Sequence, residues 1–412
     1  MILNKIDHKR RVVVTGLGVV SSLGIGWEEF WKNLMAGKSG ISKIESFDTA
    51  QYDRHYAGEV RGFDPKKFID KRKVKHMGKA SQFAIVAGKL ALKDSKITPD
   101  LMSKFKIGVA LGTTMGEIQV TEQIVKHSIK NPRLNALAKR ALILPASTIC
   151  INLAEELNLQ GNNLMFSNAC AAGNFAIGYG YDLIRAGRVD CMLAGGVDSL
   201  SRIAFTGFRR IFAMAPEKCQ PFDKNRQGMM LGEGAGIIFL ESLESAEQRK
   251  ANIYAEILGY GVSCDAYDMT DPSVKGISTS IERSIKASGI SIDKIDYISA
   301  HGTGTVENDK AECAAATKVF GKRINNIPMS SIKSMLGHTM GASAALETIA
   351  CCLAIRGGGI PPTINLENQD GECAIDCVPN KGRRKRVDVA LNNSQAFGGN
   401  NGCVVLKGKD AN

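Results

Sequence analysis

The order of predicted elements recurs in the two halves of this chain, and no other feature constrains its fold as strongly. KIGVALGTTMGE (106–117) and DYISAHGTGT (296–305) each predict a strand that ends in a glycine turn. GAGIIFLE (234–241) and NGCVVLKG (401–408) each place small residues before an apolar strand near the end of a half. We therefore expect two similar α/β halves in one body, with mixed sheets and buried helices. Two unrelated α/β domains are the alternative.

Apolar periodicity and glycine punctuation predict the individual elements. The 412 residues suit two or three domains, or one large α/β unit. Strands are expected within 11–24, 106–117, 189–200, 232–244, 251–268, 296–305 and 401–408, and helices within 26–40, 79–95, 171–187 and 277–290.

Composition narrows the class of protein. Apolar residues make up 44% of the chain and charged residues 23%, as in an ordinary globular protein. Eleven cysteines without regular spacing do not form a disulfide framework, and residues 1–10 are not a secretory signal. No apolar run approaches the length of a membrane span. These features predict a cytoplasmic protein with reduced thiols that does not span a membrane. The net charge of +12 by itself is compatible with an acidic protein, nucleic acid or anionic membrane as partner. The partner expected below is an acidic protein, and no membrane is expected as partner.

One cysteine lies where a helix is predicted to begin. Cys170 stands in SNACAAGNFAIG (167–178), just before the apolar spacing of 171–187. A helix N-terminus carries partial positive charge and can lower a thiol pKa, which would make Cys170 a nucleophile. The alternative is a buried and unreactive cysteine, because free cysteines are usually buried in the core of a protein.

Two of the six histidines lie within small-residue motifs. His301 is in SAHGTGT (299–305), and His338 is in SSIKSMLGHTMGASAALE (330–347). Glycines on either side would let substrate and backbone approach the imidazole rings. Four charged residues close to these motifs could orient the rings or bind an ion, although the two glutamates could equally be helix-surface residues: Asp309, Glu312, Lys333 and Glu347.

Four motifs in register resemble those of the β-ketoacyl-acyl-carrier-protein synthases, most closely of type II. They are SNACAAGN, AHGTGT, IKSMLGHTMGASAALE and NNSQAFGGNN (392–401), and the resemblance runs nearly end to end. It implies the thiolase fold: two β-α-β-α-β-α-β-β halves in a five-layer α-β-α-β-α body. The nucleophile would belong to an N-terminal half, 1–250, and both histidines to a C-terminal half, 251–412. A homodimer, or a heterodimer with a companion ketosynthase subunit, is expected.

The resemblance also implies a reaction and roles for individual residues. Cys170 would accept an acyl group from a carrier-protein thioester. His301 and His338 would serve decarboxylation of malonyl-carrier protein, and the resulting enolate would attack the acyl-cysteine. The N–H groups of Cys170 and Phe397 would form the oxyanion hole. Lys333 and Glu347 would support the histidines.

Further residues are implied in binding. Thr303, Thr305 and Thr270 match positions near the phosphopantetheine arm, which arrives on the carrier, so no cofactor of the enzyme itself is expected. Met115, Phe208 and Gly398 complete the substrate-binding set. No catalytic metal is implied, although some family members hold a structural cation near the positions of Asp309 and Glu312.

The basic charge then predicts an acidic carrier protein as partner. KKFIDKRKVKH (66–76) concentrates positive charge roughly where the family docks its carrier. The docking residues would be Lys71, Arg72, Lys73, Lys75, Arg209 and Arg210. A solvated basic helix is the alternative. Nucleic acid is not expected, because no aromatic platform or recognisable module is present.

Some positions depart from the family pattern. The usual Phe-Gly-Phe-Gly-Gly loop here reads Gln395-Ala396-Phe397-Gly398-Gly399. Ala396 would stiffen the backbone, and Gln395 is polar where an aromatic residue is usual. These changes suggest either a specialised enzyme for unusual or polyene-like chains or drift within a housekeeping one. Two rival functions remain. A coenzyme A-dependent thiolase is disfavoured by Phe397 and by the second histidine motif. A non-catalytic chain-length factor is disfavoured by the presence of Cys170 together with both histidines.

Overall fold

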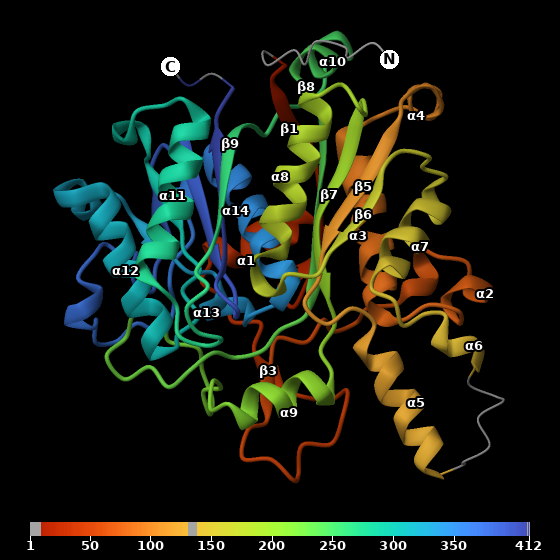
Figure 1. The fold of residues 1–412 in the computed structure, drawn as a ribbon, viewed down its shortest axis with the longest axis horizontal. Helices are drawn as coiled ribbons and strands as arrows, with labels where there is room; N and C mark the ends of the chain where they lie inside the picture. The colour runs from red at the N-terminus through yellow and green to blue at the C-terminus, as the bar shows by residue number, and fades with distance from the viewer. Residues whose placement is uncertain (1–9, 131–137, 410, 412) are drawn as a thin grey trace.

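The computed structural model describes residues 10–130, 138–409 and 411, and two strand sets of identical order form its centre (Figure 1). The first set has the order β6-β5-β7-β8-β1, and the second has the order β11-β10-β14-β15-β9. In each set the first three strands are parallel and the last two pairings are antiparallel. The strands are β1 (Val12–Ser21), β5 (Ile107–Gly112), β6 (Asn163–Phe166), β7 (Cys191–Asp198), β8 (Gly234–Ser242), β9 (Ala255–Cys264), β10 (Tyr297–Ser299), β11 (Met329–Ser330), β14 (Val389–Gln395) and β15 (Asn400–Lys407).

The two sets meet where β1 pairs antiparallel with β9 through Val12–Val14. The predicted similarity of the halves is confirmed, because corresponding strands occupy corresponding places in both sets. The predicted division at residue 250 falls between α10 (Leu243–Gln248) and β9. The division into two domains remains a prediction, because the pairing of β1 with β9 joins the two halves into one sheet.

Helices form three layers around the strands (Figure 1). In the middle lie α8 (Ala172–Arg185) and α14 (Ser343–Gly357). One outer layer contains α3 (Lys79–Ser95) and α7 (Ser147–Leu157), and the other contains α11 (Val274–Ser288) and α12 (Val306–Phe320). The five-layer prediction is therefore confirmed.

The central helix α14 is buried on nearly every side. Its sequence SAALETIACCLAIRG is rich in small and apolar residues, which lets two layers approach it closely. By length and composition, the window Met340–Gly357 could also cross a membrane, contrary to the sequence expectation. However, 83% of that window is buried inside the protein, so the helix is the core of this fold.

The remaining elements connect these layers. The predicted strands and helices all formed, with boundaries that differ by a few residues. The other helices are α1 (Trp27–Met35), α2 (Lys71–Val74), α4 (Pro99–Lys104), α5 (Ile118–Lys130), α6 (Ala138–Ala141), α9 (Arg202–Arg210) and α13 (Lys333–Leu336), and the short strands are β2 (Gly24–Ile25), β3 (Ser42–Lys43), β4 (Tyr56–Ala57), β12 (Gly359–Ile360) and β13 (Arg383–Arg384). Single 3₁₀ turns lie at Pro65–Lys67, Ala169–Ala171, Ile292–Lys294, Met340–Ala342 and Gly371–Cys373, and a longer one at Gly321–Asn326.

Candidate active site

Cys170 lies in a 3₁₀ turn that leads into α8, as the sequence predicts. Its side chain is 5% exposed, and its carbonyl accepts a hydrogen bond from Ser394 Oγ on β14 at 3.2 Å. The small residues of this segment permit a close approach to β5. A Cβ atom on Gly112 would lie 2.3 Å from the carbonyl carbon of Ala172. The packing therefore holds the nucleophile candidate between the two halves.

The expectation of a lowered thiol pKa is wrong. Burial raises the pKa of Cys170 to about 12, although the positive charge of Lys333 acts in the opposite direction. Desolvation of the thiolate thus outweighs the helix N-terminus. The resting group is a thiol, and it must lose its proton as it reacts.

His301 and His338 come together from different segments of the second half. Their ring centroids are 5.3 Å apart, and the ring planes are nearly perpendicular at 86°. Both are buried. Burial lowers the pKa of each imidazole well below its usual value, and the charge of Lys333 lowers it further. Both rings are therefore neutral at physiological pH.

Hydrogen bonds fix the tautomer of each ring. The Met340 N–H donates to His338 Nδ1 at 3.1 Å, so Nδ1 is unprotonated and the proton is on Nε2. Lys333 Nζ, which can only donate, lies 3.2 Å from His301 Nδ1, and the same reasoning places that proton on Nε2. Each ring therefore has an Nε2–H donor that these contacts leave unused.

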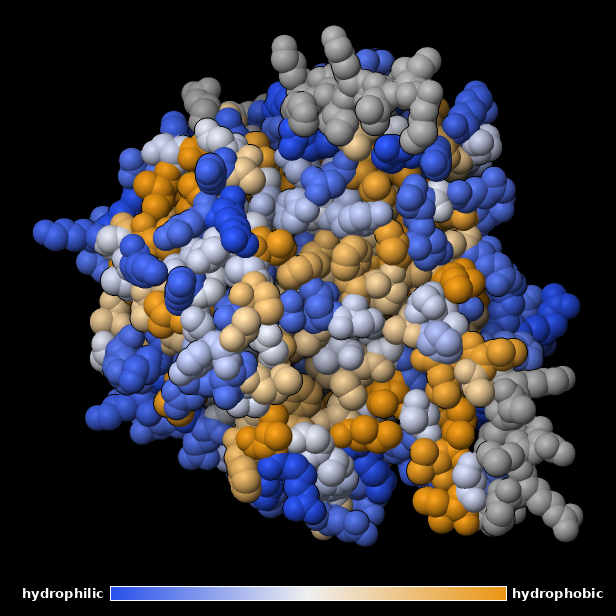
Figure 2. All heavy atoms as spheres, in the orientation of Figure 1, coloured by the Kyte–Doolittle hydropathy of each residue, from blue (hydrophilic) through white to orange (hydrophobic). Residues whose placement is uncertain are grey.

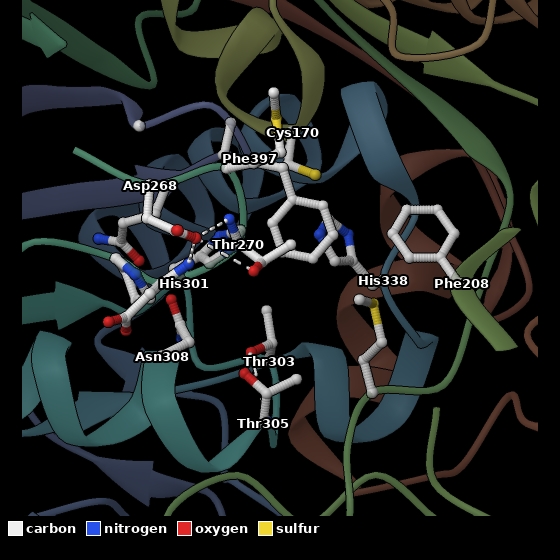
Figure 3. A pocket seen from close by; sticks show the side chains of 17 residues that line it. Cys170, Phe208, Asp268, Thr270, His301, Thr303, Thr305, Asn308, His338 and Phe397 are labelled. Carbon is white, nitrogen blue, oxygen red and sulfur yellow. Dashed lines mark hydrogen bonds between the residues drawn. The ribbon is translucent and has the colours of Figure 1, made fainter. Parts of the chain in front are cut away.

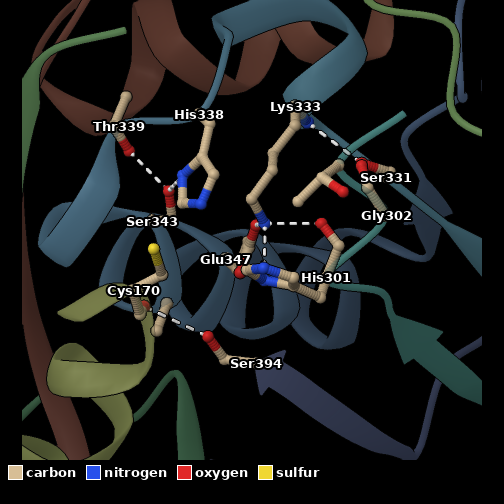
Figure 4. Close-up of polar contacts among 12 residues, drawn as sticks. Cys170, His301, Gly302, Ser331, Lys333, His338, Thr339, Ser343, Glu347 and Ser394 are labelled. Carbon is tan, nitrogen blue, oxygen red and sulfur yellow. Dashed lines mark hydrogen bonds and ion pairs between the residues drawn. The ribbon is translucent and has the colours of Figure 1, made fainter. Parts of the chain in front are cut away.

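Lys333 and Glu347 form a buried ion pair beside His301 (Figure 4). Besides Glu347 Oε1, the ammonium contacts the His301 carbonyl at 2.6 Å and His301 Nδ1 at 3.2 Å, so its three protons have three acceptors. Burial raises the pKa of Glu347 to about 7, against the stabilising charge of Lys333. The helix-surface alternative for Glu347 is wrong.

Asp309 and Glu312 hold the loop that carries His301. Glu312 accepts from the backbone N–H groups of His301 and Gly302, both at 2.8 Å, and Asp309 accepts from that of Gly304 at 3.2 Å. Both carboxylates are 0% exposed, so the helix-surface alternative for Glu312 is also wrong. Among the described residues, no group of three or more His, Cys, Asp or Glu side chains could hold a metal ion. The structural cation remains a prediction.

One cavity joins most of the predicted residues (Figure 3). The hydroxyls of Thr303 and Thr305 lie 2.8 Å apart on one side of it. Phe397 stacks on Phe208 of α9, with ring centroids 6.0 Å apart. The lining contains Cys170, Phe208, Thr270, His301, Thr303, Thr305, His338 and Phe397.

Two residues of the predicted substrate-binding set are not part of this lining. Met115 is half-buried in the loop after β5, where its N–H donates to Asp198. Gly398 lies next to the cavity in the Phe397 loop, and its N–H donates to the Met269 carbonyl at 2.8 Å. Their roles in substrate binding remain predictions.

The sequence reasoning missed Asp198. This carboxylate is 0% exposed and accepts from the Thr113 hydroxyl and from the N–H groups of Thr114, Met115 and Gly341, at 2.7–2.9 Å. It ties the ends of β5 and β7 to the segment before α14. The available signal was an aspartate at the end of the apolar run in the strand predicted within 189–200.

Other lining residues were also missed or noted only as departures. Five of them are neighbours in the chain of residues that the sequence analysis did name, and that nearness was the available signal. Thr270 is flanked by Asp268, Met269, Asp271 and Pro272, and Asp309 is preceded by Asn308. Met229, Gln395 and Ala396 also line the cavity, with Gly399.

The predicted docking residues lie in two separate places. Lys71, Arg72, Lys73 and Lys75 are exposed on or after α2, where Arg72 pairs with Asp70 and Lys73 with Glu156. Arg209 and Arg210 end α9, which also carries Phe208; Arg209 pairs with Asp53. Figure 1 places α2 and α9 well apart, so the six cations do not form one patch on this chain.

Comparison with known proteins agrees with this geometry. The models of the N-terminal and C-terminal domains of beta-ketoacyl synthase match residues 9–246 and 254–367. The chain belongs to the β-ketoacyl synthase family. It is 40% identical to a 3-oxoacyl-[acyl-carrier-protein] synthase 2 of Coxiella burnetii, over 97% of this chain and 99% of the relative.

Two solved structures show the same family fold. The ishigamide ketosynthase/chain length factor superimposes with a TM-score of 0.94 at 43% identity, covering 97% of this chain and 99% of that one. The ketosynthase of a type II polyketide synthase, bound to a hexaketide and in complex with its acyl-carrier protein, superimposes with a TM-score of 0.89 at 33% identity. It covers the same shares of the two chains. The predicted thiolase-type fold of this β-ketoacyl synthase is thus confirmed.

Proposed function

We propose that this β-ketoacyl synthase is a 3-oxoacyl-[acyl-carrier-protein] synthase that elongates a fatty-acid or polyketide chain by decarboxylative condensation. One observation carries the proposal: a buried thiol and two neutral imidazoles with free Nε2–H donors share one cavity. A thiol can hold an acyl group, and paired N–H donors can stabilise an enolate oxygen.

The first step loads the enzyme. Cys170 Sγ attacks the carbonyl carbon of an acyl thioester, and the bond from that carbon to the carrier's sulfur breaks. The Cys170 proton passes to the departing carrier thiolate, so the carrier leaves as a thiol. The N–H groups of Cys170 and Phe397 are the proposed oxyanion donors; the Phe397 N–H has no backbone or side-chain acceptor among the described residues.

The second step forms the carbon–carbon bond. A malonyl thioester loses carbon dioxide, and the electron pair of the broken bond becomes an enolate. The Nε2–H groups of His301 and His338 donate to the enolate oxygen. The enolate carbon attacks the acyl-cysteine carbonyl, the bond to Cys170 breaks, and its thiolate regains a proton from water. The products are a β-ketoacyl thioester and carbon dioxide.

The supporting residues keep the donors in place. Lys333 occupies His301 Nδ1, and Met340 N–H occupies His338 Nδ1, so neither ring can turn its proton away from the cavity. Lys333 and Glu347 are thus positioning residues. Thr303, Thr305 and Thr270 line the same cavity and supply hydroxyls for the phosphopantetheine arm. That arm belongs to the carrier, and we propose no cofactor for the synthase itself.

An acyl-carrier protein is the proposed partner. The type II polyketide synthase relative binds such a protein. In this chain, Arg209 and Arg210 adjoin Phe208 of the cavity and offer the nearest of the predicted basic docking positions. The exposed cations of α2 form a second proposed contact. Surface charges of this kind steer an acidic partner more than they stabilise the complex.

A second chain of the same fold is also proposed, either a copy of this chain or a companion subunit. Strand β6 is one of the two terminal strands of the large sheet, opposite β11, and Asn163 and Leu164 on it are exposed. Figure 2 shows apolar side chains across the middle and lower right of this face. Two exposed apolar residues lie at this edge: Leu164 on β6 itself and Ile151 on α7, which packs against β6. Further exposed apolar residues are Val125 and Ile129 on α5 and Leu142 directly after α6. An unpaired strand edge with apolar surroundings favours pairing between chains.

All eleven cysteines are free, which fits the proposed cytoplasmic location, where thiols stay reduced. The rival functions are less well supported. A chain-length factor needs no nucleophile, whereas Cys170 and both histidines are assembled here. A thiolase needs a second reactive cysteine, and Cys170 is the one cysteine among the residues that line this cavity.

Intact-protein mass spectrometry tests the function. Wild type and Cys170→Ala are mixed with a panel of acyl-carrier proteins that differ in acyl group. We expect a mass gain on the wild type alone, and the most heavily loaded acyl group identifies the substrate class. A folded wild type that gains no mass from any donor, or equal gain on both proteins, would contradict the proposal.

A further inference from the structure

Gln395 places an unpaired carboxamide in the cavity wall. It is the last residue of β14, its side chain is 3% exposed, and it lines the same cavity as Cys170 and both histidines. Neither Nε2 nor Oε1 has a hydrogen-bond partner among the described residues. Buried polar groups in proteins are nearly always paired, because an unpaired one loses its hydrogen bonds to water. A ligand that enters the cavity can supply the missing partners.

The contacts along β14 show which side of the cavity Gln395 faces. Side chains of a strand alternate between its two faces. Asn392 contacts Ala344 and Thr348 of α14, and Ser394 contacts the Cys170 carbonyl. Asn393 faces the other way and donates to Glu312 of α12 at 2.8 Å.

By this alternation, Gln395 lies on the Asn393 side. That side carries the loop with His301, Thr303 and Thr305, and α12 contributes Asn308 to the lining. Gln395 therefore adjoins the polar part of the cavity, away from the Cys170 face of the strand.

We propose that Gln395 binds the amide nearest the thioester in the arm that delivers the substrate. A carboxamide has one acceptor oxygen and a donor NH₂ group, and a secondary amide offers the matching N–H and carbonyl. Nε2 donates to the amide carbonyl, and Oε1 accepts from the amide N–H. Gln395 thus favours thioester donors whose arm has an amide at this position over donors that lack it. This inference rests on the proposed function, since it concerns the same thioester.

The experiment uses two small thioesters that differ at the amide. One is octanoyl-N-acetylcysteamine, and the other is the analogue in which an ester oxygen replaces the amide N–H. The acylation of Cys170 is followed by mass, and kcat/KM is measured for both donors. The proteins are wild type, Gln395→Met and Gln395→Phe. The matched control is Gln82→Met, in which a half-buried glutamine of α3 is replaced outside the cavity.

We expect wild type to prefer the amide donor, and Gln395→Met to lower that preference roughly tenfold, the usual worth of one or two hydrogen bonds. Gln395→Phe should lower it similarly, and Gln82→Met should leave it unchanged. The thermal midpoint of Gln395→Met should not fall, because the carboxamide has no partner to lose in the unliganded protein. If Gln395 instead stabilised the fold, the substitution Gln395→Met would lower that midpoint.

Other results overturn the inference. One is an amide preference that is equal in wild type and both Gln395 variants. Another is a Gln395 variant that lowers kcat/KM equally for both donors, since Gln395 would then contact a part of the donor that the two thioesters share. A wild type that takes no acyl group from any donor would instead contradict the proposed function, so the two failures are distinguishable.

Discussion

At the scale of single residues, one buried positive charge organises the site. Lys333 is 1% exposed, and its ammonium has acceptors on His301 and Glu347. It orients His301 through Nδ1 and lowers the pKa of both imidazoles. A buried ammonium needs full hydrogen bonding to offset its lost hydration, and this arrangement provides it.

The pH profile of malonyl-carrier decarboxylation tests this role. The imidazole pKa values lie well below 6.5, so both rings stay neutral as pH falls from 8 to 6.5, and the rate should stay level. The acid limb should appear only below pH 6.5. In the double variant Lys333→Met/Glu347→Gln, the nearby positive charge is gone, the imidazole pKa values rise, and the acid limb should move to higher pH.

Glu347→Gln alone is the control, because it retains Lys333 and its charge. Its acid limb should stay at or below that of wild type. Circular dichroism at each pH separates a titration from unfolding. An acid limb at the same pH in the double variant and in wild type would show that burial alone lowers the imidazole pKa values and that Lys333 does not contribute.

At the scale of elements, the close approach of α8 to β5 sets the position of Cys170. Gly112 ends β5 against the first residues of α8, and a Cβ atom there would lie 2.3–2.5 Å from the backbone of Ala172 and Gly173. Backbone atoms cannot rotate away as a side chain does. Any larger residue at 112 must therefore displace the helix start that carries Cys170.

Gly112→Ala should destabilise the protein by about 1–3 kcal/mol, the usual cost of overpacking, and should reduce Cys170 acylation. Chemical denaturation and the mass assay measure the two effects. Gly207→Ala in α9 is the matched control, since no atom outside the local helix backbone and the two neighbouring residues lies within 4 Å of the Cβ position there. It should be neutral or stabilising by about 0.5–1 kcal/mol. Equal stability of the two variants would show that the contact is not tight.

At the scale of the whole molecule, the sheet has a free edge at β6, next to exposed apolar side chains. A strand edge in this setting is a site for pairing or aggregation unless another chain covers it. The chain itself offers no element beyond β6 in the sheet order of the described residues. A second chain of the same fold would satisfy the edge and bury the apolar surface.

Sedimentation measures the pairing. We expect wild type to sediment at about twice the 44.3 kDa mass of one chain, and Leu164→Lys to sediment as a monomer. Ile203→Lys is the matched control, because Ile203 and Leu164 are both 38% exposed but Ile203 lies on α9. It should remain a dimer. A Leu164→Lys variant that stays dimeric would place the interface elsewhere, and a monomeric wild type would indicate a companion subunit.

The sequence by itself determined the repeated order of elements and the candidate residues of the proposed reaction. Glycine turns and apolar runs are local features, so the strands and helices could be located within a few residues. Cys170, His301 and His338 could be named because each lies in a distinctive small-residue motif. The charged residues beside them could be named, but whether they were buried or exposed could not.

Only the tertiary structure decided the electrostatics and the geometry of the site. Burial raises the pKa of Cys170 to about 12, which reverses the local expectation from the helix N-terminus. Desolvation depends on atoms that α14, β14 and the histidine loops bring from more than a hundred residues away. The same packing gives Asp198 its four donors and leaves Gln395 with none among the described residues. Neither fact is local, because hydrogen-bond partners and burial are properties of the packed chain.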